Sequence, residues 1–260
     1  MRSSEWVSTI YFVALTVVVW LRPVPFMRRL QIATIAVVMC GVVFVLAGTP
    51  APLLRNWLSP AVAILAGYYL SGLFFIRPTP WFEAWLIDWD RRLLGDPSTR
   101  FAGWPRAVLA YLDAVYVGCF LLLPVGFAAL AFNGYAGEAN HYWTLVIAAE
   151  FGSFLPLTIL QSRPPWQTEG KAVLADRSIH RAASLMVEHL TIRANTFPSG
   201  HAAGSLAVGL GVLRVLPRLG LVFLILAASI AVASVVGRYH YILDVVAGIV
   251  LTLAIWSVFT

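Results

Sequence analysis

The stretch HAAGSLAVGLGVLRVLPRLGLVFLILAASIAVASVVGRYH, residues 201–240, decides the fold of this chain. Two apolar runs, residues 202–215 and 219–236, fill almost all of it. Because one membrane span needs about 20 residues, the stretch predicts a helical hairpin that crosses the bilayer and returns. His201 and His240, at its two ends, are then expected at the same membrane face.

The composition of the whole chain is that of a membrane protein. Hydrophobic residues make up 60% of it and charged residues only 12%, whereas about a quarter of the residues of a soluble domain are charged. The spans have to be helical, because lipid offers backbone polar groups no other hydrogen-bond partner. We expect an all-α fold, a polytopic transmembrane helix bundle of about 6–8 spans with its functional site at one membrane edge. The stretches long enough to cross the ~30 Å hydrocarbon layer are residues 6–21, 30–48, 60–76, 107–132, 143–160, 201–216, 219–236 and 241–260.

The chain is interpreted as a single integral membrane domain. Residues 1–78 are expected to form N-terminal transmembrane helices, and residues 79–260 a core that carries the motifs. The first span is followed by Arg22-Pro23 and lacks a small-residue cleavage site, so we expect a retained helix rather than a signal peptide. Cys40 and Cys119 lie inside apolar runs and are interpreted as small buried hydrophobic residues.

Charge is distributed unevenly along the chain. The 18 basic residues outnumber the 12 acidic ones, which in a membrane protein indicates orientation and anionic headgroups rather than nucleic acid. Most basic residues fall in loops on the face of the two histidines, and the positive-inside rule makes that face cytoplasmic. Residues 81–94 mix tryptophans with charges, which favours a helix lying in the membrane interface. Residues 170–193 predict an amphipathic helix, either a lid over the site or a plain connector.

Both ends of the hairpin carry residues suited to phosphoryl transfer. That chemistry needs a nucleophile, a proton donor for the leaving oxygen, and cations around the equatorial oxygens. His240 is the candidate nucleophile, and Asp244, one helical turn further on, can fix its tautomer and stabilise the imidazolium that forms. His201 is the candidate proton donor to the leaving alcohol.

Four further residues are candidates for binding phosphate: Arg163, Ser199, Gly200 and Arg238. Ser199 is expected to cap a long helix, whose free N–H groups attract phosphate. Gly200 lets an oxygen approach the backbone closely. The two arginines offer planar, bidentate donors.

Two acidic residues fall inside expected spans, where a carboxylate is a functional hypothesis by default. Asp113 is expected near the basic face, where it can pair with an arginine or bind a substrate headgroup. Glu150 lies deeper, and a structural hydrogen bond between helices is favoured for it over a catalytic role.

These segments resemble the signature motifs of the type 2 phosphatidic acid phosphatase superfamily, whose soluble relatives are the vanadium haloperoxidases. Residues 198–201, Pro-Ser-Gly-His, match the second motif, and His240 with Asp244 matches the end of the third. Arg163-Pro164 matches the end of the first. The resemblance covers about residues 81–248 and implies the superfamily's helical core.

The two outlying cations of the motifs are absent. Ser234 stands where the third motif has an arginine, and Pro156 stands where the first has a lysine. The pattern is more similar to the inositol phosphorylceramide synthase-like (inositolphosphotransferase) branch. In that branch the first motif ends in Pro-Pro-Trp and the third motif reads Arg-Tyr-His-Tyr. Three further residues are expected to bind substrate or to support the site: Asp113, Ser234 and Tyr239.

The leading hypothesis is an integral membrane lipid phosphatase that hydrolyses a phosphomonoester or diphosphate headgroup through a phosphohistidine. The alternative is a phosphotransferase that moves a phospho-headgroup onto a lipid or polyol hydroxyl. The resemblance implies no metal and no other cofactor. A phosphorylated lipid and the bilayer are the expected partners, nucleic acid is not, and the oligomeric state is open.

Two other classes of function stay open. Two histidines and a carboxylate also form the facial triad of non-haem iron oxygenases, although Arg238 beside His240 would oppose a metal ion. A lipid transporter or binding protein with a decayed catalytic set would explain the absent cations. The bacterial inner membrane is the expected location. Bacterial members of the superfamily commonly carry the site on the non-cytoplasmic face, against the charge count, so its side is open.

Overall fold

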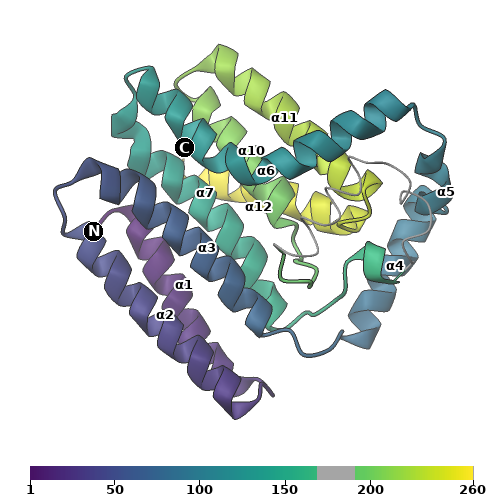
Figure 1. Ribbon diagram of the computed structural model, residues 1–260, viewed down its shortest axis with the longest axis horizontal. Coiled ribbons are helices and arrows are strands. Elements are labelled where there is room, and N and C mark those ends of the chain that lie inside the picture. Colours follow the sequence, from purple (N-terminus) through teal and green to yellow (C-terminus); the bar gives the residue numbers. More distant parts are fainter. Residues whose placement is uncertain (169–190, 260) are drawn as a thin grey trace.

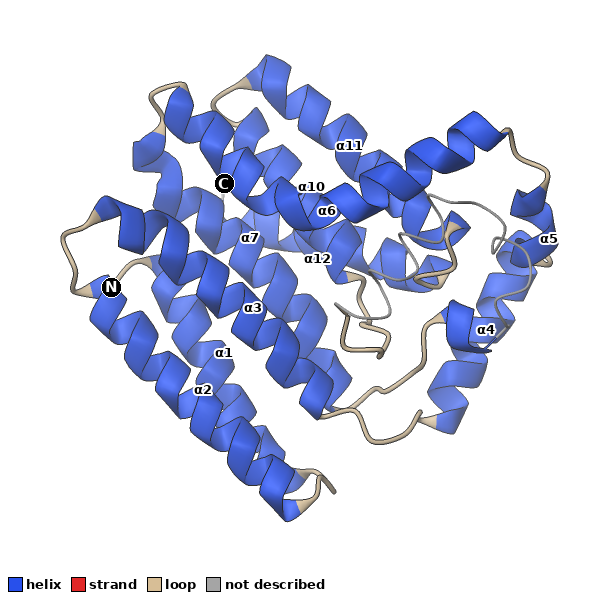
Figure 2. Cartoon of the chain, in the orientation of Figure 1, coloured by secondary structure: helices blue, strands red, loops and turns tan. Residues whose placement is uncertain are grey.

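The computed structural model describes residues 1–168 and 191–259, and within these ranges the chain is helical with no strand (Figure 2). All eight of the expected apolar stretches form helices. Five of these helices are long and apolar enough to cross a membrane. The protein is therefore an all-α membrane helix bundle, as the composition predicts.

The five long apolar helices are α1 (Ser3–Leu21), α2 (Phe26–Ala47), α6 (Arg106–Phe132), α11 (Pro217–Val236) and α12 (Ile242–Phe259). The other three expected spans are shorter: α3 (Ser59–Leu73) has 15 residues, α7 (Ala139–Phe154) has 16 and α10 (Gly200–Leu213) has 14. Their membrane crossing stays a prediction. Short elements connect them: η1 (Leu54–Leu58), α4 (Pro80–Leu94), α5 (Pro97–Ala102), η2 (Ala136–Glu138), η3 (Leu155–Thr158) and α8 (Pro165–Thr168).

Helix α10 is the centre of the bundle, although it is the shortest of the eight. It packs against α6, α7, α11 and α12, and α1 and α2 form a hairpin at the far edge of the molecule (Figure 1). Small side chains let neighbouring helices approach closely. The buried small residues of α10 are Gly200, Ala202, Ala203, Gly204, Ser205, Ala207, Gly209 and Gly211.

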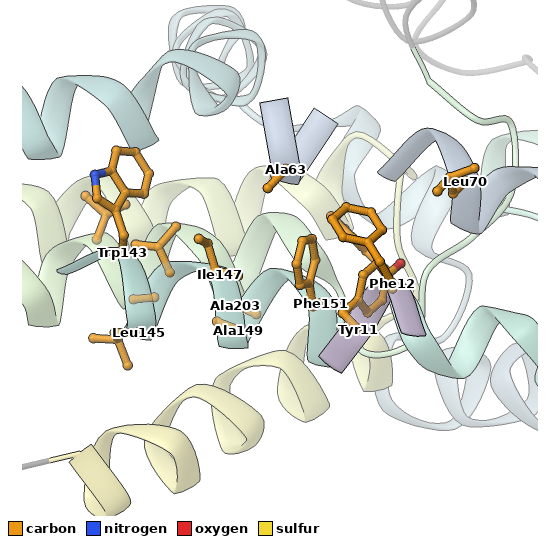
Figure 3. Packing of buried hydrophobic residues seen from close by; sticks show 14 of the residues in the cluster. Tyr11, Phe12, Ala63, Leu70, Trp143, Leu145, Ile147, Ala149, Phe151 and Ala203 are labelled. Atoms are coloured by element: carbon orange, nitrogen blue, oxygen red, sulfur yellow. The ribbon is translucent and has the colours of Figure 1, made fainter. Parts of the chain in front are cut away.

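A cluster of buried aromatic side chains joins the N-terminal helices to the rest of the bundle. The rings of Tyr11 in α1 and Phe151 in α7 stack with their centroids 4.0 Å apart (Figure 3). The Tyr11 hydroxyl donates a hydrogen bond to the carbonyl of Gly67 in α3, over 3.0 Å. Buried tyrosine is stable when its hydroxyl finds such a partner, so α1, α3 and α7 are held together at one point.

The segment expected at the membrane interface forms helix α4, at the opposite edge of the molecule from α1 and α2 (Figure 1). Trp81 and Trp85 are exposed on it, whereas Phe82 and Leu86 are buried and pack with Tyr241. The helix thus has one buried and one exposed face, as an interfacial helix would, and its position in the membrane interface stays a prediction. The amphipathic helix expected at residues 170–193 falls almost entirely outside the described residues.

An ion pair ties α4 to the loop that follows η3. Arg163 Nη2 lies 2.8 Å from Glu83 Oε2, and the Arg163 backbone N–H donates to Glu83 Oε1 over 2.8 Å. Burial raises the pKa of Glu83, but the hydrogen bonds from Arg163 outweigh it, so the pKa lies below its ordinary value. Glu83 is therefore ionised at neutral pH and holds the loop in place.

We expect Glu83→Gln to lower the free energy of unfolding at pH 7 by up to about 1 kcal/mol, because the Arg163 side chain is half exposed. Since the folded state lowers the pKa of Glu83, the pair stabilises above the ordinary value of about 4.3 and is lost as the pH falls through the lowered one. The measurement is the thermal unfolding midpoint in detergent for both proteins. The difference between the two midpoints should disappear on acidification. An equal difference at low and at neutral pH would contradict a stabilising Glu83–Arg163 ion pair.

Gly220, near the start of α11, is expected to tolerate no side chain. A Cβ at this position would overlap the backbone of Leu213 in α10, which cannot move aside. Overpacking of this kind costs about 1–3 kcal/mol, so Gly220→Ala should lower the unfolding midpoint. Gly41→Ala in α2 is the matched control, because a Cβ there meets nothing within 4 Å. Equal midpoints for the two variants would refute the close packing of α10 on α11.

Candidate active site

The hairpin brings its two histidines into direct contact. His201 lies in the first turn of α10, after Ser199, whose hydroxyl accepts a hydrogen bond from the Ala202 N–H over 3.3 Å as the expected N-cap. His240 lies in the link between α11 and α12. His201 Nδ1 and His240 Nε2 are 3.2 Å apart, so α10 and α11 return the two rings to one end of the bundle.

Asp244 lies on the other side of the His240 ring. Its Oδ2 is 3.4 Å from His240 Nδ1 and accepts the Tyr241 N–H over 2.8 Å. A carboxylate beside Nδ1 favours the proton on that nitrogen, which leaves the lone pair on Nε2. Burial lowers the pKa of His240 to about 3, so its imidazole is neutral at pH 7. The arrangement provides a neutral nitrogen nucleophile that faces His201.

A cavity of about 350 Å³, with its mouth included, opens beside the two histidines. Its walls are rich in aromatic rings. Tyr239 stacks on Tyr116 with centroids 3.9 Å apart, and Tyr116 stacks on the His201 ring at 5.0 Å. Arg193 provides a cation at the wall. The lining residues are Tyr68, Tyr116, Pro164, Trp166, Thr191, Arg193, Ala194, Thr196, His201, Tyr239 and His240.

The two arginines predicted to bind phosphate lie outside this lining, each against a carboxylate of α4. Arg163 contacts Glu83, and Arg238 Nη2 lies 2.8 Å from Asp90 Oδ2. Their binding of phosphate stays a prediction. Ser199 and Gly200 are both buried at the start of α10, and their binding of phosphate also stays a prediction.

The remaining predicted residues lie around the histidines at different depths. Tyr239 lines the cavity. Ser234 supports the link from behind, because its carbonyl accepts the N–H of Tyr239 over 2.9 Å and that of His240 over 3.0 Å. Asp113 is buried in α6 and is not among the described lining residues. Glu150 of α7 fills the space beside Gly204 of α10, where a Cβ would overlap its carboxylate, and its hydrogen bond between helices stays a prediction.

Several cavity residues escaped the sequence interpretation. Tyr68 comes from α3, among the N-terminal helices that carry no motif, and no local signal pointed to it. Arg193 lies eight positions before His201 and has φ 55°, a left-handed backbone that is uncommon outside glycine. Within residues 1–168 and 191–259, no group of three or more His, Cys, Asp or Glu side chains is placed to hold a metal ion.

Comparisons with known proteins place the chain in a family. A PA-phosphatase related-family protein of Dictyostelium discoideum is 45% identical over 58 residues, which are 22% of this chain and 10% of that relative. The chain thus matches only a tenth of the relative's length. No solved structure matches it significantly. The family model described as PAP2 superfamily matches residues 84–258, a range that includes both histidines and Asp244, and the chain belongs to the PAP2 superfamily.

Proposed function

We propose that this protein is an integral membrane lipid phosphatase that hydrolyses a phosphomonoester or diphosphate headgroup through a phosphohistidine on His240. One observation carries the proposal: Asp244, His240 and His201 lie in a row, and His201 Nδ1 is 3.2 Å from His240 Nε2. Membership of the PAP2 superfamily supports a phosphatase or phosphotransferase of lipids. The distinction between these two reactions, and the substrate, belong to the proposal.

In the first step, the Nε2 lone pair of His240 attacks the phosphorus of a headgroup held in the cavity that both histidines line. The bond from phosphorus to the leaving oxygen breaks, and that oxygen takes a proton from His201, whose imidazolium form the bound anionic headgroup stabilises. The phosphohistidine carries positive charge, which the carboxylate of Asp244 stabilises across Nδ1. The lipid alcohol then leaves, or the lipid monophosphate when the substrate is a diphosphate.

In the second step, His201 takes a proton from water, and the resulting oxygen attacks the phosphohistidine. The phosphorus–nitrogen bond breaks, inorganic phosphate leaves, and His240 regains its lone pair. The equatorial oxygens need cationic or N–H donors throughout. Arg193 at the cavity wall is the candidate for this role. Arg163, Ser199, Gly200 and Arg238 stay candidates from the sequence.

A second candidate is transfer of the headgroup to an alcohol. His240 is only 4% exposed, and the cavity beside it is walled by aromatic rings that include Tyr68, Tyr116 and Tyr239. A hydroxyl-bearing acceptor held against these rings would exclude the competing water. The chemistry at His240 would be unchanged, because the alcohol oxygen takes the place of water in the second step. The membrane face that carries the site stays a prediction in either case.

The first test is phosphate release in detergent, with a chelator present, from phosphatidate, lysophosphatidate and isoprenyl diphosphates. We expect His240→Ala to abolish release, because the nucleophile is gone. His201→Ala and Asp244→Asn should each lower kcat by about 10²–10⁴-fold. Wild-type protein quenched during turnover with radiolabelled substrate should carry acid-labile label, and His240→Ala should carry none.

The control is His141→Ala in α7, whose ring packs against Trp256 and does not line the cavity. It should keep the wild-type rate. Release that survives in His240→Ala would refute the mechanism. No release from folded wild-type protein, followed by headgroup transfer to an added alcohol, would select the phosphotransferase. If the protein catalyses neither reaction under any of these conditions, both candidate functions are rejected.

Arg193 provides a test of the cavity as the headgroup site. Hydrogen bonds to a charged group contribute about 1.5–3 kcal/mol, so Arg193→Gln should raise KM by about 10–100-fold, and Arg193→Lys should raise it less. Arg214→Gln is the matched control, since Arg214 follows the other end of α10 and pairs with Glu138. The measurement is KM for the best substrate. Equal KM values for the Arg193 and Arg214 variants would place the headgroup elsewhere.

A further inference from the structure

One carboxylate outside the motifs holds both flanks of His240. Asp90 Oδ2 lies 2.8 Å from Arg238 Nη2, and Asp90 Oδ1 accepts the backbone N–H of Ile242 over 2.8 Å. Arg238 precedes His240 by two residues, and Ile242 follows it by two. The two oxygens of Asp90 therefore bracket the proposed nucleophile from α4, a helix about 150 residues earlier in the chain.

The contact is deeply buried. The Asp90 and Arg238 side chains are 0% and 8% exposed, so water cannot replace either partner. Loss of one member of a buried pair leaves an uncompensated charge, which is far more costly than the loss of a surface pair. Asp90 thus constrains the link strongly, whereas its neighbour Asp88 on the same helix is exposed.

The backbone of the link needs such a constraint. Arg238 has φ 59°, a left-handed conformation that a residue other than glycine keeps only where its surroundings impose it. The Trp166 N–H bonds to the Arg238 carbonyl over 3.0 Å, but this bond fixes one side of the link only. Asp90 also fixes the start of α12 from the side of α4, while the Ser199 N–H holds the Asp244 carbonyl from the side of α10.

We propose that Asp90 is the positioning residue of His240, which it aims at the incoming phosphorus by clamping the Arg238 side chain and the Ile242 N–H at once. The inference rests on the proposed function. Asp90 does not line the cavity among the described residues, so it acts through the link and not on substrate. A displacement of about 1 Å at a nucleophile can lower the rate by 10²-fold. Loss of the Asp90 contacts should therefore lower kcat.

The test compares Asp90→Asn with Asp88→Asn in full-length protein purified in detergent. Asp90→Asn keeps an oxygen for the Ile242 N–H but loses the charge that holds Arg238. We expect kcat to fall about 100-fold, KM to stay within threefold of wild type, and Asp88→Asn to match wild type in both. Orthovanadate, a mimic of the phosphoryl transition state, should bind Asp90→Asn more weakly by a factor similar to the loss in kcat.

A double-mutant cycle with Arg238→Gln separates the clamp from direct binding of phosphate by Arg238. If Arg238 acts through Asp90, the double variant should lose no more than about threefold beyond the worse single variant. Fully additive losses, a rise in KM without a fall in kcat, or unchanged vanadate affinity in Asp90→Asn would each overturn the inference. If Asp90→Asn does not fold, Asp90→Glu keeps the charge and shifts the link by one methylene, and the same fall in kcat is expected.

The vanadate comparison also distinguishes this inference from the proposed function. If wild-type protein neither releases nor transfers phosphate, the proposed function fails, while weaker vanadate binding by Asp90→Asn still supports the clamp. If wild-type protein turns over and Asp90→Asn equals it, the clamp fails and the proposed function stands. Wild-type protein that neither turns over nor binds vanadate would overturn both.

Discussion

One backbone hydrogen bond holds the two halves of the site together. The Ser199 N–H, just before α10, donates to the carbonyl of Asp244 in the first turn of α12 over 2.8 Å. The approach is possible because Gly248, one turn further along α12, has no side chain; a Cβ there would lie 2.7 Å from the Ser199 carbonyl oxygen. Two motifs that are distant in sequence thus start their helices side by side, and the positions of His201, His240 and Asp244 depend on that contact.

Around this contact, the bundle meets two opposing demands. Spans must be apolar to remain in lipid, and phosphoryl chemistry needs charges. The chain meets both by pairing the arginines next to the site with carboxylates, where helix α4 supplies Glu83 to Arg163 and Asp90 to Arg238. Helix α4 is therefore a brace for two motif-bearing loops, and its exposed tryptophans leave its outer face for the membrane interface.

Much of the architecture could be predicted from patterns that are local in sequence. Apolar runs are long and unbroken, so the helices at residues 202–215 and 219–236 and their reversal follow from hydropathy and length. The cap at Ser199 follows from a serine next to a glycine before an apolar run. Span counting was less secure at α3, α7 and α10, since a central helix can be short when its neighbours bury it. Asp90 and Arg193 could not be found in this way, because their roles depend on residues far away in the chain.

The sequence by itself determined that this is an α-helical membrane protein with two histidines and an aspartate at one end of a hairpin, because hydrophobic length and the i to i+4 spacing are properties of local chain geometry. Only the tertiary structure decided which charge meets which. From the sequence, Arg163 and Arg238 were equally good candidates for binding phosphate. In the structure, a carboxylate of α4 contacts each of them. Ion pairing acts between atoms about 3 Å apart in space, and no spacing along the chain specifies contacts across some 80 to 150 residues.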